Sequence, residues 1–129
     1  IGPRDIENNQ CVLVRRDTLE KEIVSLDNVN ARIAELLEEI QKNMFNMAKE
    51  NTENKTTIAK NLEEFENNIN TNQGYVKTMW CGSAECEEKI HNLTGAKSRC
   101  MPFNQEHISD TCVCCGKPAN KMVVWGRQY

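Results

Sequence analysis

The sequence has few aromatic residues, which fill 5% of its 129 positions, and its apolar residues together reach only 39%. A chain of this length is expected to form one compact domain or two very small ones. The supply of apolar residues is thin for one large hydrophobic core, so a further source of stability such as a bound metal is expected. No apolar run approaches the roughly 20 residues that a membrane helix requires, so we expect no contact with a membrane. No signal peptide is visible and the chain starts at Ile1, so we expect a piece of a longer protein.

The sequence also lacks a glycine-rich phosphate loop and any interpretable set of serine, histidine and aspartate residues, so it predicts no catalytic site. The two histidines, His91 and His107, are isolated, and we expect His107 to make a local hydrogen bond in a loop. A net charge of −3 argues against a basic coat over the whole chain, although residues 96–129 carry five basic against two acidic side chains.

Cysteine, by contrast, is abundant, with seven residues. In the run CVCCG at 112–116, two intervening residues let Cys112 and Cys115 reach one ion, whereas adjacent cysteines in extended chain point apart. Gly116 strengthens this choice, because glycine can take a positive φ and let backbone N–H groups approach sulfur.

The only other close pair is Cys81 and Cys86, which we place at a strand end and in the first turn of a helix. The sequence therefore predicts a zinc site of Cys81, Cys86, Cys112 and Cys115. Four cysteines leave no open coordination position, so the metal is expected to be structural. The remaining three cysteines are expected to be buried or incidental thiols: Cys11, Cys100 and Cys114.

Two other interpretations of the cysteines stay open at this point. The odd count, with sequons at Asn54 and Asn92, is compatible with a secreted disulfide protein. The clustered spacing instead indicates a reducing compartment and a metal. A free-standing zinc ribbon that binds nucleic acid or protein would carry the same cysteines.

Periodicity predicts the elements of the first part of the chain. Residues 1–26 have the character of strand and turn, with a hairpin formed by 11–16 and 21–25. A helix capped by Asp27 or Asn28 follows, and we expect its apolar stripe to pack on a sheet. The stripe consists of Val29, Ile33, Leu36, Leu37, Ile40, Met44 and Met47.

A polar linker is predicted at 49–57, followed by a second helix that carries Ile58, Leu62, Phe65 and Ile69. Strands are predicted at 75–80, 98–103 and 121–125, and a helix capped by Ser83 is predicted to close at Gly95. The fold class is therefore α+β: small mixed sheet elements with helices, in two parts, the second a four-cysteine zinc-binding α/β domain.

Three stretches resemble the C-terminal zinc-binding domain of prolyl-tRNA synthetases of the archaeal/eukaryotic-like type. They are VKTMWCGSAECEEKI at 76–90, TGAKSRCMPF at 94–103 and the ending 112–129. Upstream, IGPRDIENNQCVLVRRDTLEKEIVSLD at 1–27 resembles the closing hairpin and last helix of the anticodon-binding domain. The resemblance implies that 1–54 is the C-terminal part of a class II anticodon-binding domain and that 55–129 is the zinc-binding domain.

The same resemblance implies an enzyme that joins proline to its tRNA with ATP and Mg²⁺, in a catalytic domain that would lie before Ile1. This part alone is then expected to be inactive. The four cysteines match the family's zinc ligands. Arg4 falls on a segment that faces the anticodon bases, and an arginine fork suits guanine, which the proline anticodon carries twice. Arg15, Arg16 and Lys21 are candidates for tRNA phosphates.

The partners implied are the proline tRNA and the catalytic domain, within a parent enzyme that is a homodimer in the cytoplasm. In the family the last tyrosine packs against the catalytic domain. Tyr129 ends this chain in the matching way and is expected to be loose without that partner.

Overall fold

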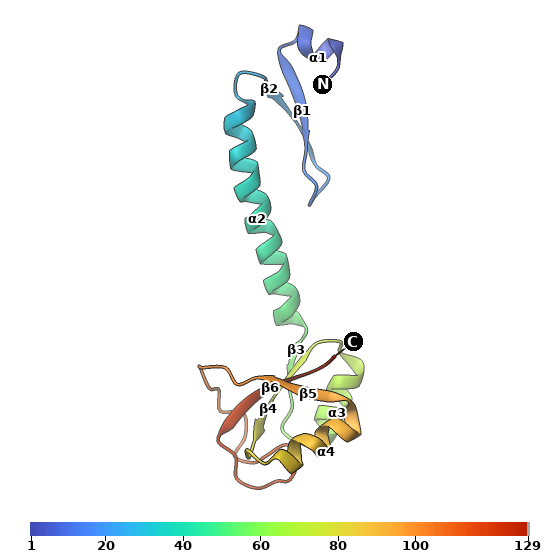
Figure 1. Cartoon of the computed structure of the whole chain (residues 1–129), viewed down its shortest axis with the longest axis vertical. Coiled ribbons are helices and arrows are strands. Elements are labelled where there is room, and N and C mark those ends of the chain that lie inside the picture. The colour runs from blue at the N-terminus through green and yellow to red at the C-terminus, as the bar shows by residue number, and fades with distance from the viewer. Residues whose placement is uncertain (129) are drawn as a thin grey trace. The chain divides into compact units, whose positions relative to one another are not determined.

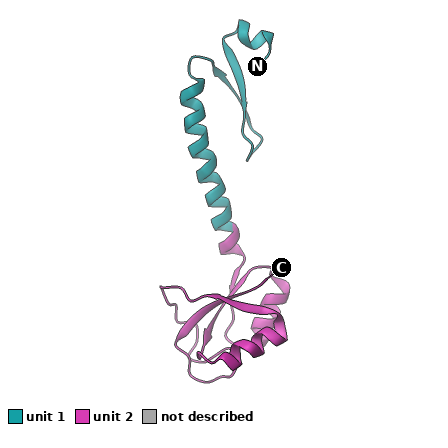
Figure 2. Ribbon diagram, viewed as in Figure 1, with its two compact units in different colours: residues 1–50 teal, residues 51–129 magenta. Residues whose placement is uncertain are grey.

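The computed structural model describes residues 1–128, so Tyr129 and the expectation attached to it lie outside the described residues. The chain divides into two compact units, Ile1–Glu50 and Asn51–Tyr129 (Figure 2). The division falls inside the long helix α2, a few residues before the boundary that the sequence suggests.

Unit 1 begins with a short helix, α1 (Pro3–Glu7), where the sequence led us to expect only strand and turn. The expectation was wrong because Gly2 caps this helix, Pro3 occupies its first turn, and the Asp5 carboxylate accepts the Gly2 N–H at 2.8 Å. The predicted hairpin is confirmed: β1 (Gln10–Val14) pairs antiparallel with β2 (Lys21–Ser25). Cys11 and Val24 lie opposite each other and are buried.

Helix α2 (Val29–Asn54) is the predicted first helix, but it runs on through most of the predicted linker (Figure 1). The linker prediction was wrong because residues 49–54 hold neither glycine nor proline, so nothing in them ends a helix. The expected packing of the whole apolar stripe on a sheet was also wrong. Leu36 is buried, whereas Leu37, Met44 and Met47 are each more than half exposed.

Unit 2 contains a four-stranded sheet in the order β3-β4-β6-β5. Its strands are β3 (Thr56–Ile58), β4 (Tyr75–Trp80), β5 (Ala96–Cys100) and β6 (Lys121–Arg127). Strand β3 runs parallel to β4, and the other pairs are antiparallel. The strand at 75–80 is confirmed, and those predicted at 98–103 and 121–125 lie within two or three residues of β5 and β6.

Two helices complete unit 2: α3 (Leu62–Thr71) and α4 (Ala84–Thr94). Asn61 caps α3 by accepting the Glu64 N–H at 2.9 Å, which places Ile58 outside the helix and corrects that assignment. Helix α4 is confirmed, with Ser83 at its N-cap and Gly95 at φ 72° closing it.

The core of unit 2 lies between the sheet and the two helices. Trp125 of β6 is fully buried and meets Phe65 of α3 edge to face, with ring centroids 6.1 Å apart. The Trp125 indole N–H donates to the buried Thr78 hydroxyl at 2.9 Å. This core fixes β4 and α4, the two elements that carry the first cysteine pair.

The α+β class is confirmed, with small mixed sheet elements and helices in both units. Among the described residues, no helix is long and apolar enough to span a membrane.

Candidate metal centre

Four cysteines that are distant in the sequence come together in unit 2. Cys81 directly follows β4, and Cys86 lies in the first turn of α4. Cys112 and Cys115 belong to the long connection from β5 to β6. All four sulfurs lie within 4.8 Å of one another. The structure thus brings together the whole predicted ligand set, which we call the cysteine cluster.

Local backbone geometry presents each pair to the other. Gly82 adopts φ 92° at the corner between β4 and α4, a conformation that other residues rarely take. In the second pair, the Gly116 N–H donates to the Cys112 carbonyl at 3.0 Å, with Gly116 at φ 69° as its predicted role requires. The Val113 N–H donates to the Met79 carbonyl at 3.0 Å, which attaches this turn to β4.

Two of the sulfur separations match the edge of a tetrahedron around one ion. Cys81 Sγ lies 3.7 Å from Cys86 Sγ and 3.8 Å from Cys115 Sγ. Four thiolates at a zinc–sulfur distance of about 2.3 Å form a tetrahedron with edges of about 3.8 Å. A disulfide would need a separation of about 2.05 Å. The cluster therefore has the geometry of a metal site, and the donor set fits a closed, structural one.

Burial and backbone hydrogen bonds act in opposite directions on these thiols. Burial raises the pKa of Cys112, but N–H groups of Cys115, Cys114 and Cys81 outweigh it and lower the pKa to about 7. Burial, with bonds to the neighbouring thiols Cys115 and Cys81, holds the pKa of Cys86 well above its usual range. A cation between the sulfurs would favour the thiolate form of all four.

The other three cysteines lie outside the cluster. Cys11 is buried in the hairpin, Cys100 is exposed on β5, and Cys114 packs partly buried against the core. All seven cysteines are free thiols in the described part of the chain. His107 Nε2 lies 3.1 Å from a carboxylate oxygen of Asp110, three residues away, which makes an ion pair when the imidazole is protonated.

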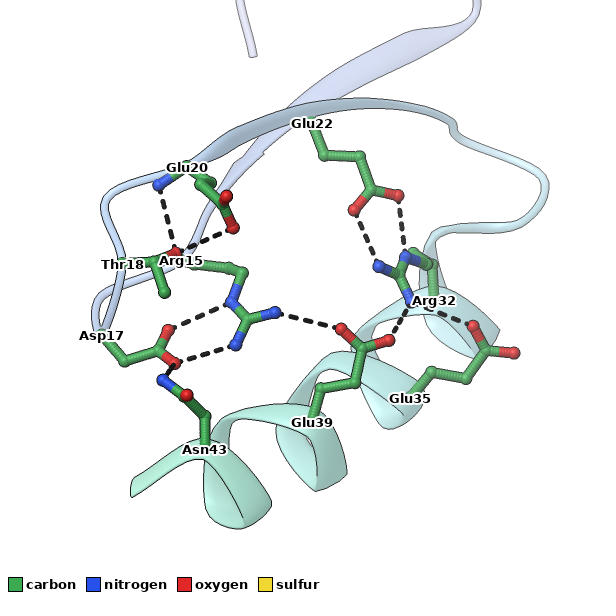
Figure 3. A network of polar contacts seen from close by, with 9 residues as sticks. All are labelled: Arg15, Asp17, Thr18, Glu20, Glu22, Arg32, Glu35, Glu39 and Asn43. Carbon is green, nitrogen blue, oxygen red and sulfur yellow. Dashed lines mark hydrogen bonds and ion pairs between the residues drawn. The ribbon is translucent and has the colours of Figure 1, made fainter. Parts of the chain in front are cut away.

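A second polar constellation lies in unit 1, where two arginines connect the hairpin to α2 (Figure 3). The Arg15 guanidinium contacts Asp17 at 2.8 Å and Glu39 at 3.1 Å. The Arg32 guanidinium contacts Glu22 of β2 at 2.7 Å and Glu39 at 2.8 Å. Because both arginines meet at Glu39, the contacts form one continuous system, which we call the arginine network.

Among the carboxylates that form these ion pairs, Asp17 is the least exposed, because only 5% of its side-chain surface is accessible to solvent. The hydrogen bond from Arg15 holds the pKa of Asp17 well below its usual range, and a bond from Asn43 at 2.8 Å acts in the same direction. Likewise the hydrogen bond from Arg32 lowers the pKa of Glu22. Asp17 and Glu22 therefore stay ionised at lower pH than ordinary carboxylates of their type.

The four predicted tRNA-binding residues all belong to unit 1 but differ in their surroundings. Arg4 lies exposed on α1, and Arg16 and Lys21 lie exposed at the two sides of the hairpin turn. Arg15 is the exception, because its side chain is 18% exposed and its charge is matched by two carboxylates.

The arginine network was not expected from the sequence. One signal was available, since Arg32, Glu35 and Glu39 are spaced to share a helix face. The bonds from the hairpin to Glu39 and Asn43 span 24 and 26 residues, and no local pattern reports them.

Comparison with protein families finds a match over residues 62–129 to the family described as prolyl-tRNA synthetase, C-terminal. Among individual proteins, the chain is 56% identical over 129 residues to a proline–tRNA ligase of Clostridium botulinum. It is 54% identical to the proline–tRNA ligase of Lachnoclostridium phytofermentans. Each alignment covers the whole chain but only 27% of the relative's length, so the chain spans about a quarter of these proteins.

A solved structure shows the same likeness. The crystal structure of prolyl-tRNA synthetase from Cryptosporidium parvum, complexed with L-proline and AMP, superposes with a TM-score of 0.89 at 31% identity. The superposition covers 100% of this chain and 28% of that one. Structural similarity therefore extends over both units, beyond the residues that the family description covers.

Proposed function

The chain belongs to the prolyl-tRNA synthetase C-terminal family, and on that premise we propose that it is the C-terminal part of a proline–tRNA ligase. The observation that carries the proposal is 56% identity over the entire chain to ligases almost four times as long. The parent enzyme would attach proline to its tRNA with ATP and Mg²⁺. This part would contribute anticodon-side tRNA recognition and structural support, without an active site.

The two predicted domains divide these tasks. Residues 1–54 would form the C-terminal part of the anticodon-binding domain, and 55–129 the zinc-binding domain. The exposed apolar residues of unit 1 support this division. Leu37 and Met44 on α2, with Val14 and Ile23 on the hairpin, would be covered by the rest of the anticodon-binding domain.

Zinc is the metal that the cysteine cluster would hold, bound through Cys81, Cys86, Cys112 and Cys115. All four donors are cysteine sulfurs within 4.8 Å of one another, and a set of four cysteines is typical of structural zinc sites. The bound ion would link β4, α4 and the β5–β6 connection, three segments that are separate in the sequence. Metal binding would thus supply part of the folding free energy of the unit.

For tRNA recognition, we assign the direct contacts to Arg4, Arg16 and Lys21. All three are exposed, and none forms an ion pair among residues 1–128. Arg4 would read a guanine edge with its two-pronged guanidinium, and the other two would contact phosphates. Arg15 would act less directly, because Asp17 and Glu39 balance its charge, and it would hold the hairpin turn that presents Arg16.

The remaining partners follow from the parent enzyme. They are the proline tRNA, the preceding catalytic domain with its ATP and Mg²⁺, and a second subunit in a homodimer. Seven free thiols fit a reducing compartment, and we place the enzyme in the cytoplasm.

The test is proline charging by the full-length ligase that contains this sequence. We expect Arg4→Ala to raise the KM for the proline tRNA about tenfold, the loss of one good base contact. ATP–pyrophosphate exchange with proline, which needs no tRNA, should stay unchanged. Glu7→Ala, on the same exposed helix, serves as the control. No proline-dependent exchange by the full-length chain would refute the ligase assignment, and an unchanged KM would refute the role of Arg4.

A further inference from the structure

A lysine ammonium lies at the corner of unit 2 that presents the first cysteine pair. Lys121 is the first residue of β6 and pairs with Trp80, the last residue of β4, in the antiparallel register. Its Nζ lies over the Trp80 ring, 5.9 Å from the ring centroid. Because Trp80 directly precedes Cys81 in the chain, the charge of Lys121 is held against the residue next to the first ligand of the cysteine cluster.

The Trp80 ring is itself fixed at this corner. Its indole N–H donates to the Ser83 carbonyl at 3.2 Å, so the ring is attached to the turn between β4 and α4. The side chain also packs partly buried against the hydrophobic core of unit 2. A cation within about 6 Å of a tryptophan ring is attracted by the electrons of the ring face. Trp80 therefore gives the ammonium of Lys121 a fixed surface to lie on.

Gly82 leaves open the space that the ammonium occupies. A Cβ added at Gly82 would lie 3.1 Å from Lys121 Nζ and 3.9 Å from Lys121 Cε. The φ of 92° at Gly82 also favours glycine, so both the backbone and the neighbouring lysine select the same residue here. Since Gly82 lies between Cys81 and Cys86 in the sequence, the ammonium lies beside the backbone that joins these two ligands.

The charge of the metal centre makes a cation at this place favourable. Four thiolates around one Zn²⁺ ion leave the centre with a net negative charge. Two carboxylates, Glu85 and Glu87, flank Cys86 in the first turn of α4 and add charge of the same sign. Within residues 1–128, Lys121 forms no ion pair with a carboxylate, so its charge is available to the centre.

We propose that Lys121 balances the charge of the metal centre. Its ammonium, held on Trp80 and admitted by Gly82, stabilises the anionic metal–thiolate cluster and slows the release of the metal. Lys121 acts through its charge and is not a ligand. Residues around a metal site commonly tune its affinity in this way without touching the ion. The inference rests on the zinc site of the proposed function and adds to it a residue outside the four cysteines.

The experiment measures the zinc affinity of the full-length ligase that contains this sequence, by competition with a chromophoric chelator. Lys121→Met keeps most of the apolar stem on Trp80 but removes the charge, and we expect it to weaken zinc binding about tenfold in dilute buffer. In about 1 M salt, where charges are screened within a few ångströms, the difference should shrink to about twofold. Lys121→Arg keeps the charge and should stay within about twofold of the wild type.

Lys97→Met is the matched control, because Lys97 is exposed on β5 and pairs with Gly126 near the other end of β6. Its zinc affinity should equal that of the wild type. Equal affinities for Lys121→Met and the wild type in dilute buffer overturn the proposal. A loss of the same size at low and high salt also overturns it, because it would report packing on Trp80 rather than charge.

The same titration separates the inference from the zinc site on which it rests. If the wild-type ligase binds zinc but Lys121→Met binds it equally well, only the role of Lys121 fails. If the wild-type ligase binds no zinc at all, the proposed zinc site fails and the role of Lys121 fails with it.

Discussion

The exposed position of Cys115 allows metal binding to be separated from packing. Cys112 is only 2% exposed, so a substitution there disturbs both the core and the cluster. Cys115 is exposed, and serine in its place would leave no cavity. Any destabilisation by Cys115→Ser would therefore report the lost thiolate alone.

We expect Cys115→Ser to weaken metal affinity by more than about 100-fold, since losing even an outer-shell contact costs about 10- to 100-fold. Competition with a chromophoric chelator measures this affinity. Cys100→Ser is the control, because Cys100 is exposed and outside the cluster. Equal affinities for the Cys115 variant and the wild type would remove Cys115 from the ligand set.

At Asp17 the structure predicts a dependence of stability on pH. Arg15 lowers the pKa of Asp17 in the folded chain, so the folded state binds fewer protons than the unfolded state in acid. The resulting stabilisation is fully present above the usual aspartate pKa of about 4 and is lost as the pH falls toward the folded value. Asp17→Asn should remove this part of the acid dependence.

Hydrogen exchange of the hairpin amides between pH 2 and pH 7 measures the effect, after correction for the intrinsic exchange rates. Glu38→Gln is a suitable control, because Glu38 is exposed on α2 and joins no ion pair in the described residues. A variant whose protection follows the wild-type curve throughout would show that the network does not stabilise the hairpin.

Among the individual elements, those bounded by residues with special backbone properties could be predicted from the sequence. Helix α4 lies between Ser83 and Gly95, and the second of these adopts the left-handed conformation that glycine favours. The cysteine cluster was predictable for a similar reason. Each pair is local in sequence, and the chemistry of one ion requires the two pairs to meet.

The elements that could not be predicted lack such signals. The end of α2 is polar all round and exposed, and a solvated helix there has the same composition as a loop. Strand β3 has three residues and is defined by its parallel pairing with β4, about twenty residues later. Ile58 also fits a helical spacing to Leu62, so the local pattern favoured the wrong element.

The turn at Gly116 gives a prediction at the level of this element. Its φ of 69° is left-handed, while a Cβ added there would meet no atom within 4 Å. Gly116→Ala should therefore cost about 1 kcal/mol through backbone strain alone, whereas Gly116→Asn should cost less, because asparagine tolerates this conformation.

Thermal unfolding of the metal-bound chain, followed by tryptophan fluorescence, measures both variants. Both tryptophans, Trp80 and Trp125, lie in unit 2, so the signal reports that unit. Equal destabilisation by alanine and asparagine would contradict a purely conformational role for Gly116.

For the whole molecule, the division into two units predicts that metal removal acts on one of them. The cysteine cluster lies entirely in unit 2, whereas the arginine network lies entirely in unit 1. A zinc chelator should therefore expose Trp80 and Trp125 and abolish hydrogen-exchange protection after residue 74. Hydrogen-exchange protection of residues 29–48 in α2 should largely persist. Added zinc should restore the protection that is lost after residue 74.

The most direct test of the central claim is X-ray absorption at the zinc edge on the purified chain. The account predicts one zinc ion per chain with four sulfur neighbours at about 2.3 Å. Zinc surrounded by nitrogen or oxygen, or by fewer than four sulfurs, would contradict the assignment of Cys81, Cys86, Cys112 and Cys115 as the ligands that stabilise unit 2.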